Sequence, residues 1–155
     1  MENLLDVRGL KTSFNTKFGE VQAVRGVSFQ LTKGEVVGVV GESGCGKSIT
    51  MMSIMRLLDK NGIIKDGRIF FEGKDISKIT EKEMSKIRGN DIAMIFQDPM
   101  TSLNPLITIG NQIIEPLIIH EKLSKKEAFK KGVELLRLVN IPNPEKRMKQ
   151  YPHEF

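Results

Sequence analysis

The sequence has a single cysteine, Cys45, in 155 residues, and no long apolar run. One cysteine excludes an intramolecular disulfide bond and any zinc site built from a cysteine cluster. The longest apolar stretches, residues 36–40 and 113–119, fall short of the roughly 20 residues that a membrane-spanning helix needs. The start of the sequence lacks the basic residues and apolar run of a secretory signal. We therefore expect a cytosolic protein, which only other subunits could hold at a membrane.

The composition is that of an ordinary soluble domain, with 39% hydrophobic and 28% charged residues. The net charge of +5 owes much to one helix-like stretch of lysines, at positions 122, 125, 126, 130 and 131. This stretch predicts a solvated helix face, with an acidic partner as the alternative. No aromatic residues are interleaved with the lysines, so we expect no nucleic acid as a partner.

The first third of the chain has the patterns of β structure. Residues 27–32 alternate between apolar and polar and predict a strand with one buried face. Residues 36–40, with four valines and a glycine, predict a strand buried on both faces. The next elements are predicted as a helix at 47–58, a loop at 59–67, a short strand at 68–72 and another strand at 91–96.

The remainder is predicted to be mainly helical. Thr80 with Glu83, and Ser124 with Glu127, match capping boxes that begin helices ending near residues 88 and 140. The composition shifts near Asn104. The sequence thus predicts an α/β fold, with residues 1–103 as an antiparallel β flank plus core and residues 104–155 as an incomplete helical subdomain.

Residues 41–48, with the sequence GESGCGKS, match the phosphate-binding P-loop pattern at every position. A predicted strand precedes the motif and a predicted helix follows it, as this loop requires. Its glycines allow successive N–H groups to face one phosphate, Lys47 can reach the β- and γ-phosphates, and the Ser48 hydroxyl suits Mg²⁺. The residues assigned to nucleotide binding are Gly41, Ser43, Gly44, Cys45, Gly46, Lys47, Ser48 and Ile49. Cys45 is interpreted as a small residue tolerated in the loop, with a reactive thiol as the alternative.

Residues 96–105, FQDPMTSLNP, resemble the Q-loop of ABC-transporter ATPases, and in this form the oligopeptide/dipeptide-import subfamily. The GESG of the P-loop, the YPHEF of residues 151–155, and Ala23-Val24 followed by residues 27–29 are similar to the same subfamily. The resemblance covers the whole chain. It implies a P-loop core of the ABC type that binds ATP and Mg²⁺.

The resemblance also implies roles for two side chains outside the P-loop. Gln97 would lie near the γ-phosphate as a catalytic residue and a Mg²⁺ contact, and its amide offers both an acceptor and donors. The alternative is a polar loop residue. Phe14, or failing that Phe18, would stack on adenine, although either ring could instead belong to the core.

The resemblance further implies partners: transmembrane permease subunits, and a second ATPase subunit in a homo- or heterodimer, at the cytoplasmic side of the membrane. Residues 107–119 would either dock on the permease or form a buried subdomain face. The 155 residues contain no signature motif, Walker B strand, catalytic glutamate or switch histidine. We expect an importer subunit truncated before the signature motif and inactive by itself. The alternatives are a nucleotide-binding module without catalysis and another P-loop NTPase, although no guanine-reading Asn-Lys-x-Asp motif is present.

Overall fold

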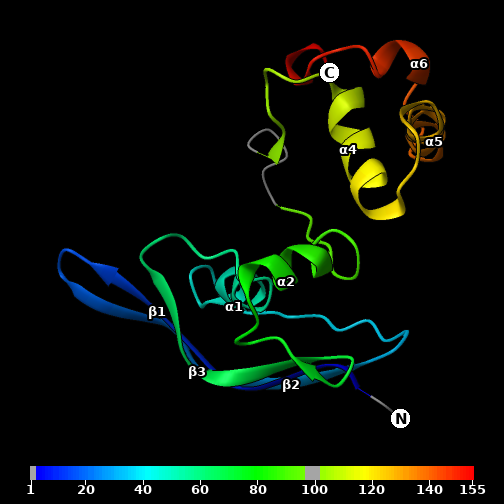
Figure 1. Cartoon of the computed structure of the whole chain (residues 1–155). Helices are drawn as coiled ribbons and strands as arrows, with labels where there is room; N and C mark the ends of the chain where they lie inside the picture. Colours follow the sequence, from blue (N-terminus) through cyan, green and yellow to red (C-terminus); the bar gives the residue numbers. More distant parts are fainter. Residues whose placement is uncertain (1–2, 97–101) are drawn as a thin grey trace. The chain divides into compact units, whose positions relative to one another are not determined.

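The computed structural model describes residues 3–96 and 102–155. The chain divides into two units, Met1–Ser85 and Lys86–Phe155. The first unit contains the sheet and the P-loop, and the second contains most of the helices (Figure 1). The predicted boundary at residue 103, between the β flank plus core and the helical subdomain, stays a prediction.

A four-stranded antiparallel sheet with the order β2-β1-β3-β4 forms the first unit. Its strands are β1 (Asn3–Thr16), β2 (Gly19–Thr32), β3 (Gly62–Phe71) and β4 (Lys74–Asp75). The long β1 is central and pairs with both β2 and β3. The expected antiparallel β flank is therefore confirmed, and the predicted strand at 27–32 is the second half of β2.

Helix α1 (Lys47–Ile54) packs on β1 and β2. Apolar side chains that are almost fully buried in this unit include Val7, Leu10, Val24, Ile54 and Ile69. A buried pair of hydroxyls joins the helix to the sheet: the Oγ atoms of Thr12 and Ser53 are 2.8 Å apart, and Ser53 donates to the carbonyl of Ile49. Because both hydroxyls are satisfied, their burial costs little.

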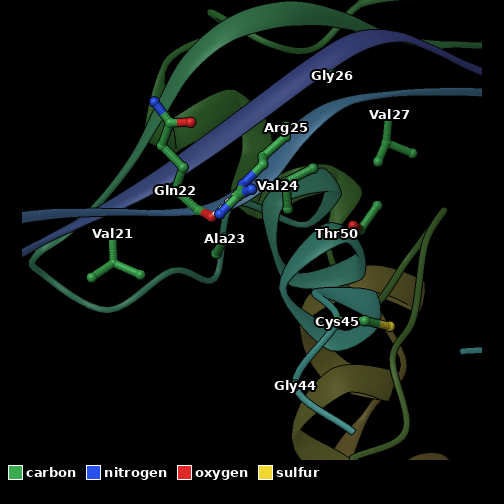
Figure 2. A pocket seen from close by; sticks show the side chains of 10 residues that line it. All are labelled: Val21, Gln22, Ala23, Val24, Arg25, Gly26, Val27, Gly44, Cys45 and Thr50. Carbon is green, nitrogen blue, oxygen red and sulfur yellow. Dashed lines mark hydrogen bonds between the residues drawn. The ribbon is translucent and has the colours of Figure 1, made fainter. Parts of the chain in front are cut away.

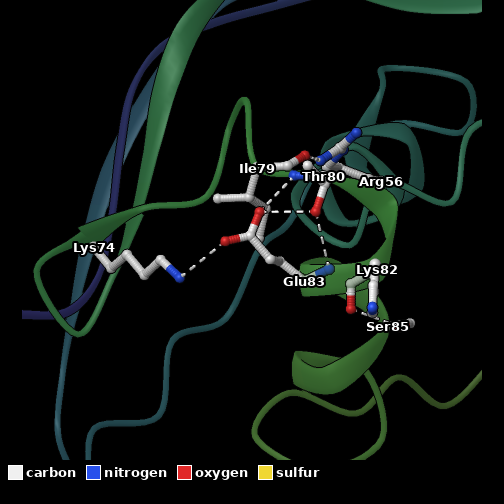
Figure 3. A network of polar contacts seen from close by, with 7 residues as sticks. All are labelled: Arg56, Lys74, Ile79, Thr80, Lys82, Glu83 and Ser85. Atoms are coloured by element: carbon white, nitrogen blue, oxygen red, sulfur yellow. Dashed lines mark hydrogen bonds and ion pairs between the residues drawn. The ribbon is translucent and has the colours of Figure 1, made fainter.

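Helix α2 (Glu81–Ile87) begins with the capping box that the sequence predicts (Figure 3). The carboxylate of Glu83 accepts from the backbone N–H of Thr80 at 2.9 Å and from its hydroxyl at 2.8 Å. Lys74 of β4 lies 3.9 Å from the same carboxylate, and Arg56, after α1, donates to the carbonyl of Ile79. These contacts connect α2 to β4 and to the end of α1.

The second unit is helical, as the sequence predicts. Among its described residues, the helices that follow α2 are α4 (Ile109–Glu121), α5 (Lys125–Leu138), α6 (Pro144–Arg147) and the short 3₁₀ helix η1 (Pro152–Glu154). The predicted capping box of Ser124 and Glu127 begins α5, with both reciprocal hydrogen bonds present. The lysine face is solvated as predicted, with Lys131 half-buried and paired to Glu121 at 2.5 Å. None of the helices in residues 3–96 and 102–155 is long and apolar enough to cross a membrane.

The apolar stretch at residues 107–119 has two environments. Ile109, Ile114 and Leu117 are buried, the last two in the core of the helical unit. Ile118 and Ile119 are 37% and 52% exposed. The buried-face interpretation thus accounts for one side of α4 and leaves the other side open to solvent.

Two of the predicted strands are wrong. Residues 35–42 have no regular secondary structure, and Val36 and Val40 are 96% and 93% exposed. Residues 93–96 are likewise irregular, with Ile95 98% exposed, and only Ile92 makes an isolated bridge to Arg88. A strand buried on both faces needs neighbouring strands and covering helices. No strand among the described residues pairs with either segment.

Two element boundaries also differ from the sequence-based ones. The predicted loop at 59–67 is wrong beyond residue 61, because β3 begins at Gly62. Gly62 is a close-packing position and not a loop signal: a Cβ atom there would lie 2.8 Å from the ring of Phe14. Helix α1 ends at Ile54, earlier than the predicted residue 58, and Arg56 follows with a left-handed φ of 52°.

Candidate phosphate-binding site

The P-loop is formed by the residues directly before α1. Gly44 and Gly46 have φ values of 79° and 93°, the left-handed region in which glycine is the favoured residue. Gly46 is the N-cap of α1, and no side chain caps the helix. The chain therefore enters the helix through glycines, which leaves the positive end of its dipole open to an anion.

Backbone N–H groups provide the main donors of this loop. Within the described residues, the N–H groups of Gly44, Gly46, Lys47 and Ser48 have no hydrogen-bond acceptor in the chain. Clustered free N–H groups at a helix N-terminus are the elements of a phosphate-binding concavity. The loop can thus bind a phosphate through its backbone.

The ammonium group of Lys47 lies inside the loop. Its Nζ donates to the carbonyl oxygen of Gly41 at 2.8 Å, to that of Glu42 at 2.7 Å, and to the sulfur of Cys45 at 3.5 Å. An ammonium has three donors, so these contacts occupy all of them. An incoming phosphate must therefore replace at least one of these acceptors.

Ser48 and Ile49 occupy the first turn of α1. Ser48 is exposed and Ile49 is half-buried. The Ser48 hydroxyl makes no hydrogen bond within the described residues, so its oxygen is free to ligate a hard cation. Those residues contain no group of three His, Cys, Asp or Glu side chains that could hold a metal. Among the described residues, Ser48 is therefore a side chain of the P-loop that offers Mg²⁺ a ligand, together with the oxygens of a bound phosphate.

A cavity of about 640 Å³ lies between β2 and the P-loop (Figure 2). Its walls come from residues 21–27 of β2, from Gly44 and Cys45 of the loop, and from Thr50 of α1. The volume is in the range of small-molecule sites. The cavity extends from the phosphate-binding loop along β2, where the remainder of a nucleotide could lie.

The two candidate stacking residues lie outside the walls of this cavity. Phe14 is half-buried on β1, in register with Val21 of β2, and its ring contacts the position of Gly62. Phe18 is fully exposed in the turn between β1 and β2. Since Val21 itself lines the cavity, Phe14 lies one strand away from it. Its stacking role stays a prediction.

Gln97, the predicted catalytic residue, lies outside the described residues. Its neighbour Phe96 is 43% exposed. The role of Gln97 therefore stays a prediction.

A turn between β2 and the P-loop segment is stabilised by hydrogen bonds from Thr32 to the carboxylate of Glu35. The pKa of Glu35 is lowered, first because the backbone N–H of Thr32 donates to the carboxylate and then because the Thr32 hydroxyl does so. This turn ends β2 and directs the chain toward residues 36–40.

Sequence reasoning missed the β2 side of the site. Gln22 and Arg25 line the cavity, and Arg25 donates to the carbonyl of Gln22 at 3.4 Å. The sequence marks Ala23 and Val24 only through the resemblance to a family. The mixture of apolar and polar residues upstream of residue 27 is the sequence feature that could have extended the predicted strand toward Gly19.

Comparisons with known proteins identify the family of the chain. A family model described as "ABC transporter" matches residues 24–155. The chain is 58% identical over 153 residues to the oligopeptide transport ATP-binding protein OppD of Bacillus subtilis, covering 98% of this chain and 43% of that protein. It is 56% identical over 156 residues to the dipeptide transport ATP-binding protein DppD of the same organism, covering 100% and 47%. The chain thus spans less than half the length of these two relatives.

Solved structures share the fold. A dimeric post-hydrolysis state of the ATP-binding cassette MJ0796 with ADP and Pi aligns with a TM-score of 0.80 at 21% identity, covering 97% of this chain and 62% of that one. The structure of cbiO1 from Clostridium perfringens aligns with a TM-score of 0.65 at 24% identity, covering 100% and 56%. The expected α/β fold with a P-loop is confirmed, with the exception of the strands at 36–40 and 91–96.

Proposed function

Since this chain belongs to the ABC transporter family, we propose that it binds ATP through residues 41–48 as part of the ATP-binding subunit of a transporter. One observation supports this most strongly. The free N–H groups of the loop, the ammonium of Lys47 and the start of α1 converge beside a cavity of about 640 Å³. Three kinds of positive group around one concavity suit a polyphosphate.

The transported solute is proposed from the relatives. OppD and DppD of Bacillus subtilis are an oligopeptide and a dipeptide transport ATP-binding protein, and both match nearly the whole of this chain. We propose that the whole protein couples ATP binding and hydrolysis to the import of small peptides. Its partners would be transmembrane permease subunits and a second ATPase subunit, at the cytoplasmic side of the membrane. Ile118 and Ile119, on the exposed side of α4, are available for the permease contact.

Each group of the site is proposed to contact one part of the bound Mg²⁺–ATP. Lys47 and the loop amides hold the phosphates, and Ser48 ligates Mg²⁺ from the protein side. Gln97 would position the attacking water or Mg²⁺ in the whole protein. In a full-length protein with its transporter, Gln97→Ala should lower turnover with ATP affinity nearly unchanged. A higher KM with unchanged kcat would contradict this role.

Titration calorimetry with ATP, with and without Mg²⁺, tests the nucleotide site. Lys47→Ala should weaken binding by roughly 1.5–3 kcal/mol, as expected for a charged hydrogen bond. Lys149→Ala, at an exposed lysine of the helical unit, is the matched control and should leave the affinity unchanged. Equal ATP affinity of the Lys47→Ala variant and the unmodified chain would refute the proposal.

A nucleotide-binding module without catalysis is the second candidate. It is supported by the P-loop alone, because the loop amides and the ammonium of Lys47 suit phosphate binding whether or not hydrolysis follows. Phosphoryl transfer needs further groups that position the attacking water and stabilise the transferred charge. Under this alternative the chain binds ATP as proposed and does not turn it over.

A further inference from the structure

Two arginines lie directly opposite each other on neighbouring strands of the sheet. Arg8 of β1 is the cross-strand partner of Arg68 of β3. Like charges that face each other across an antiparallel pair are destabilising. Asp6 compensates the charge of Arg8 in this pair, and no such partner among the described residues compensates Arg68.

The pair lines a polar cleft of about 540 Å³, which is separate from the P-loop cavity. Two further cations, Lys65 and Lys78, belong to the same lining. The cleft also contains two carboxylates, Asp66 and Asp75. Its six ionisable groups thus carry a net positive charge.

Two of the four cations already have partners. Arg8 pairs with Asp6 at 2.5 Å and stacks over the ring of Phe70, with its guanidinium carbon 4.7 Å from the ring centre. Lys65 pairs with Glu20 at 3.2 Å. Arg68 and Lys78, in contrast, make no hydrogen bond or ion pair to any described residue.

The two carboxylates of the cleft are also engaged. Asp66 accepts from the N–H of Gly67 at 2.8 Å and from Lys11 at 3.1 Å. Asp75 accepts from Ser77 twice, from its hydroxyl at 2.6 Å and from its N–H at 2.9 Å. The pKa of Asp75 is lowered mainly by the Ser77 hydroxyl, and to a smaller extent by the charges of Arg68 and Lys78. Arg68 and Lys78 thus line the same cleft, and neither carboxylate of the cleft forms an ion pair with them.

We propose that this cleft binds a phosphate group, held by Arg68 and Lys78. A phosphate monoester carries close to two negative charges and three acceptor oxygens, which matches two unpaired cations. The arginine fork can bind two of these oxygens at once, and the lysine supplies a point charge. Asp66 and Asp75 disfavour an extended polyanion, so the ligand is one compact phosphate and not a nucleic acid.

Titration of the ¹⁵N-labelled chain with inorganic phosphate, followed by NMR, tests the proposal. The amide signals of Gly67 and Ser77 should shift in a saturable manner. Arg68→Gln should weaken this binding about tenfold, and Lys149→Gln should leave it unchanged. The Lys47→Ala variant should lose the response of the P-loop amides and keep that of the cleft, which separates the two sites. Absence of shifts at Gly67 and Ser77, or equal affinity of the Arg68→Gln and Lys149→Gln variants, would overturn the proposal.

Thermal unfolding gives a second measurement on the same variants. Arg68→Gln should reduce the stabilisation that phosphate adds to the folded chain. A variant that phosphate stabilises as much as the unmodified chain would count against the site. Co-sedimentation with vesicles that contain phosphatidic acid, a lipid phosphate monoester, identifies the source of the phosphate. Binding that depends on Arg68 indicates a lipid headgroup, and its absence indicates a soluble phosphate ester.

Discussion

Gly46 lies directly against the carbonyl oxygen of Ala23: a Cβ atom at Gly46 would come within 2.5 Å of that oxygen. The contact joins the P-loop to β2 through backbone atoms alone. Since backbone cannot be displaced as easily as a side chain, no larger residue fits at position 46 without moving the loop or the strand.

Gly46→Ala should therefore destabilise the chain by about 2–4 kcal/mol, from the clash and from the left-handed φ together. Gly44→Ala is the matched control. Gly44 also has a positive φ, but a Cβ there would meet nothing within 4 Å. It should lose only the conformational part, about 1–2 kcal/mol. Urea unfolding of both variants measures the difference, and equal losses would show that the contact with Ala23 is unimportant.

The Phe14→Ala variant distinguishes two roles of the Phe14 ring, stacking on adenine and packing in the core. If Phe14 stacks on adenine, the affinities for ATP and ADP should fall alike, by about 0.5–1.5 kcal/mol beyond the lost area. If the ring serves only to pack over Gly62, the variant should lose stability while the nucleotide affinities stay unchanged. Calorimetry and urea unfolding on one preparation distinguish these results. Phe18→Ala, at the fully exposed fallback candidate, is measured in the same way, and a loss of nucleotide affinity there instead would assign the stacking to Phe18.

The capping box of α5 predicts a pH dependence. The pKa of Glu127 is lowered from its ordinary value of 4.5, first by the Ser124 hydroxyl and then by the Ser124 N–H. A lowered pKa in the folded chain means that the carboxylate stabilises the fold above pH 4.5, and that this contribution is lost as the pH falls through the lowered value. An NMR titration should find the Glu127 pKa below 4.5, and Ser124→Ala should raise it toward that value. An unchanged pKa in this variant would contradict the assignment.

The exposed valines predict self-association. Val36 and Val40 are almost fully exposed in an apolar stretch that has no strand partner among the described residues. Unpaired apolar segments of this kind favour strand exchange and aggregation. Replacing both valines with lysine should shift the chain toward the monomer in sedimentation velocity. Urea unfolding should show little change in stability, because neither side chain is packed. Identical sedimentation of the variant and the unmodified chain would disprove the role of this segment.

The chain alone should bind ATP without hydrolysing it. It has groups for the phosphates in Lys47 and for Mg²⁺ in Ser48, but no residue that matches the Walker B aspartate or its adjacent base. Steady-state phosphate release by the purified chain, compared with Lys47→Ala, measures this. Repeated turnover that the substitution abolishes would show that other residues complete the active site.

Local features were the ones that the sequence could predict. The P-loop depends on glycines and a lysine within eight positions, and the capping boxes depend on residues three apart, so their chemistry is complete within a short window. The strand predictions for residues 36–40 and 91–96 were wrong because the burial of a strand depends on the strands and helices around it. The apolar composition of both segments suits a buried strand, but no described strand pairs with either segment. The β2 wall of the cavity was missed for a similar reason, since only the packing of the P-loop against β2 at Ala23 brings Gln22 and Arg25 beside the loop.

The exposure of residues 36–40 has a consequence for the lifetime of the chain in a cell. Chaperones and proteases act on apolar segments that are open to solvent, and they do so before any question of global unfolding arises. Residues 36–40 are therefore a segment on which such factors could act while the sheet and α5 remain folded. The expression level of the chain, more than its melting temperature, would report whether residues 36–40 are covered by other residues.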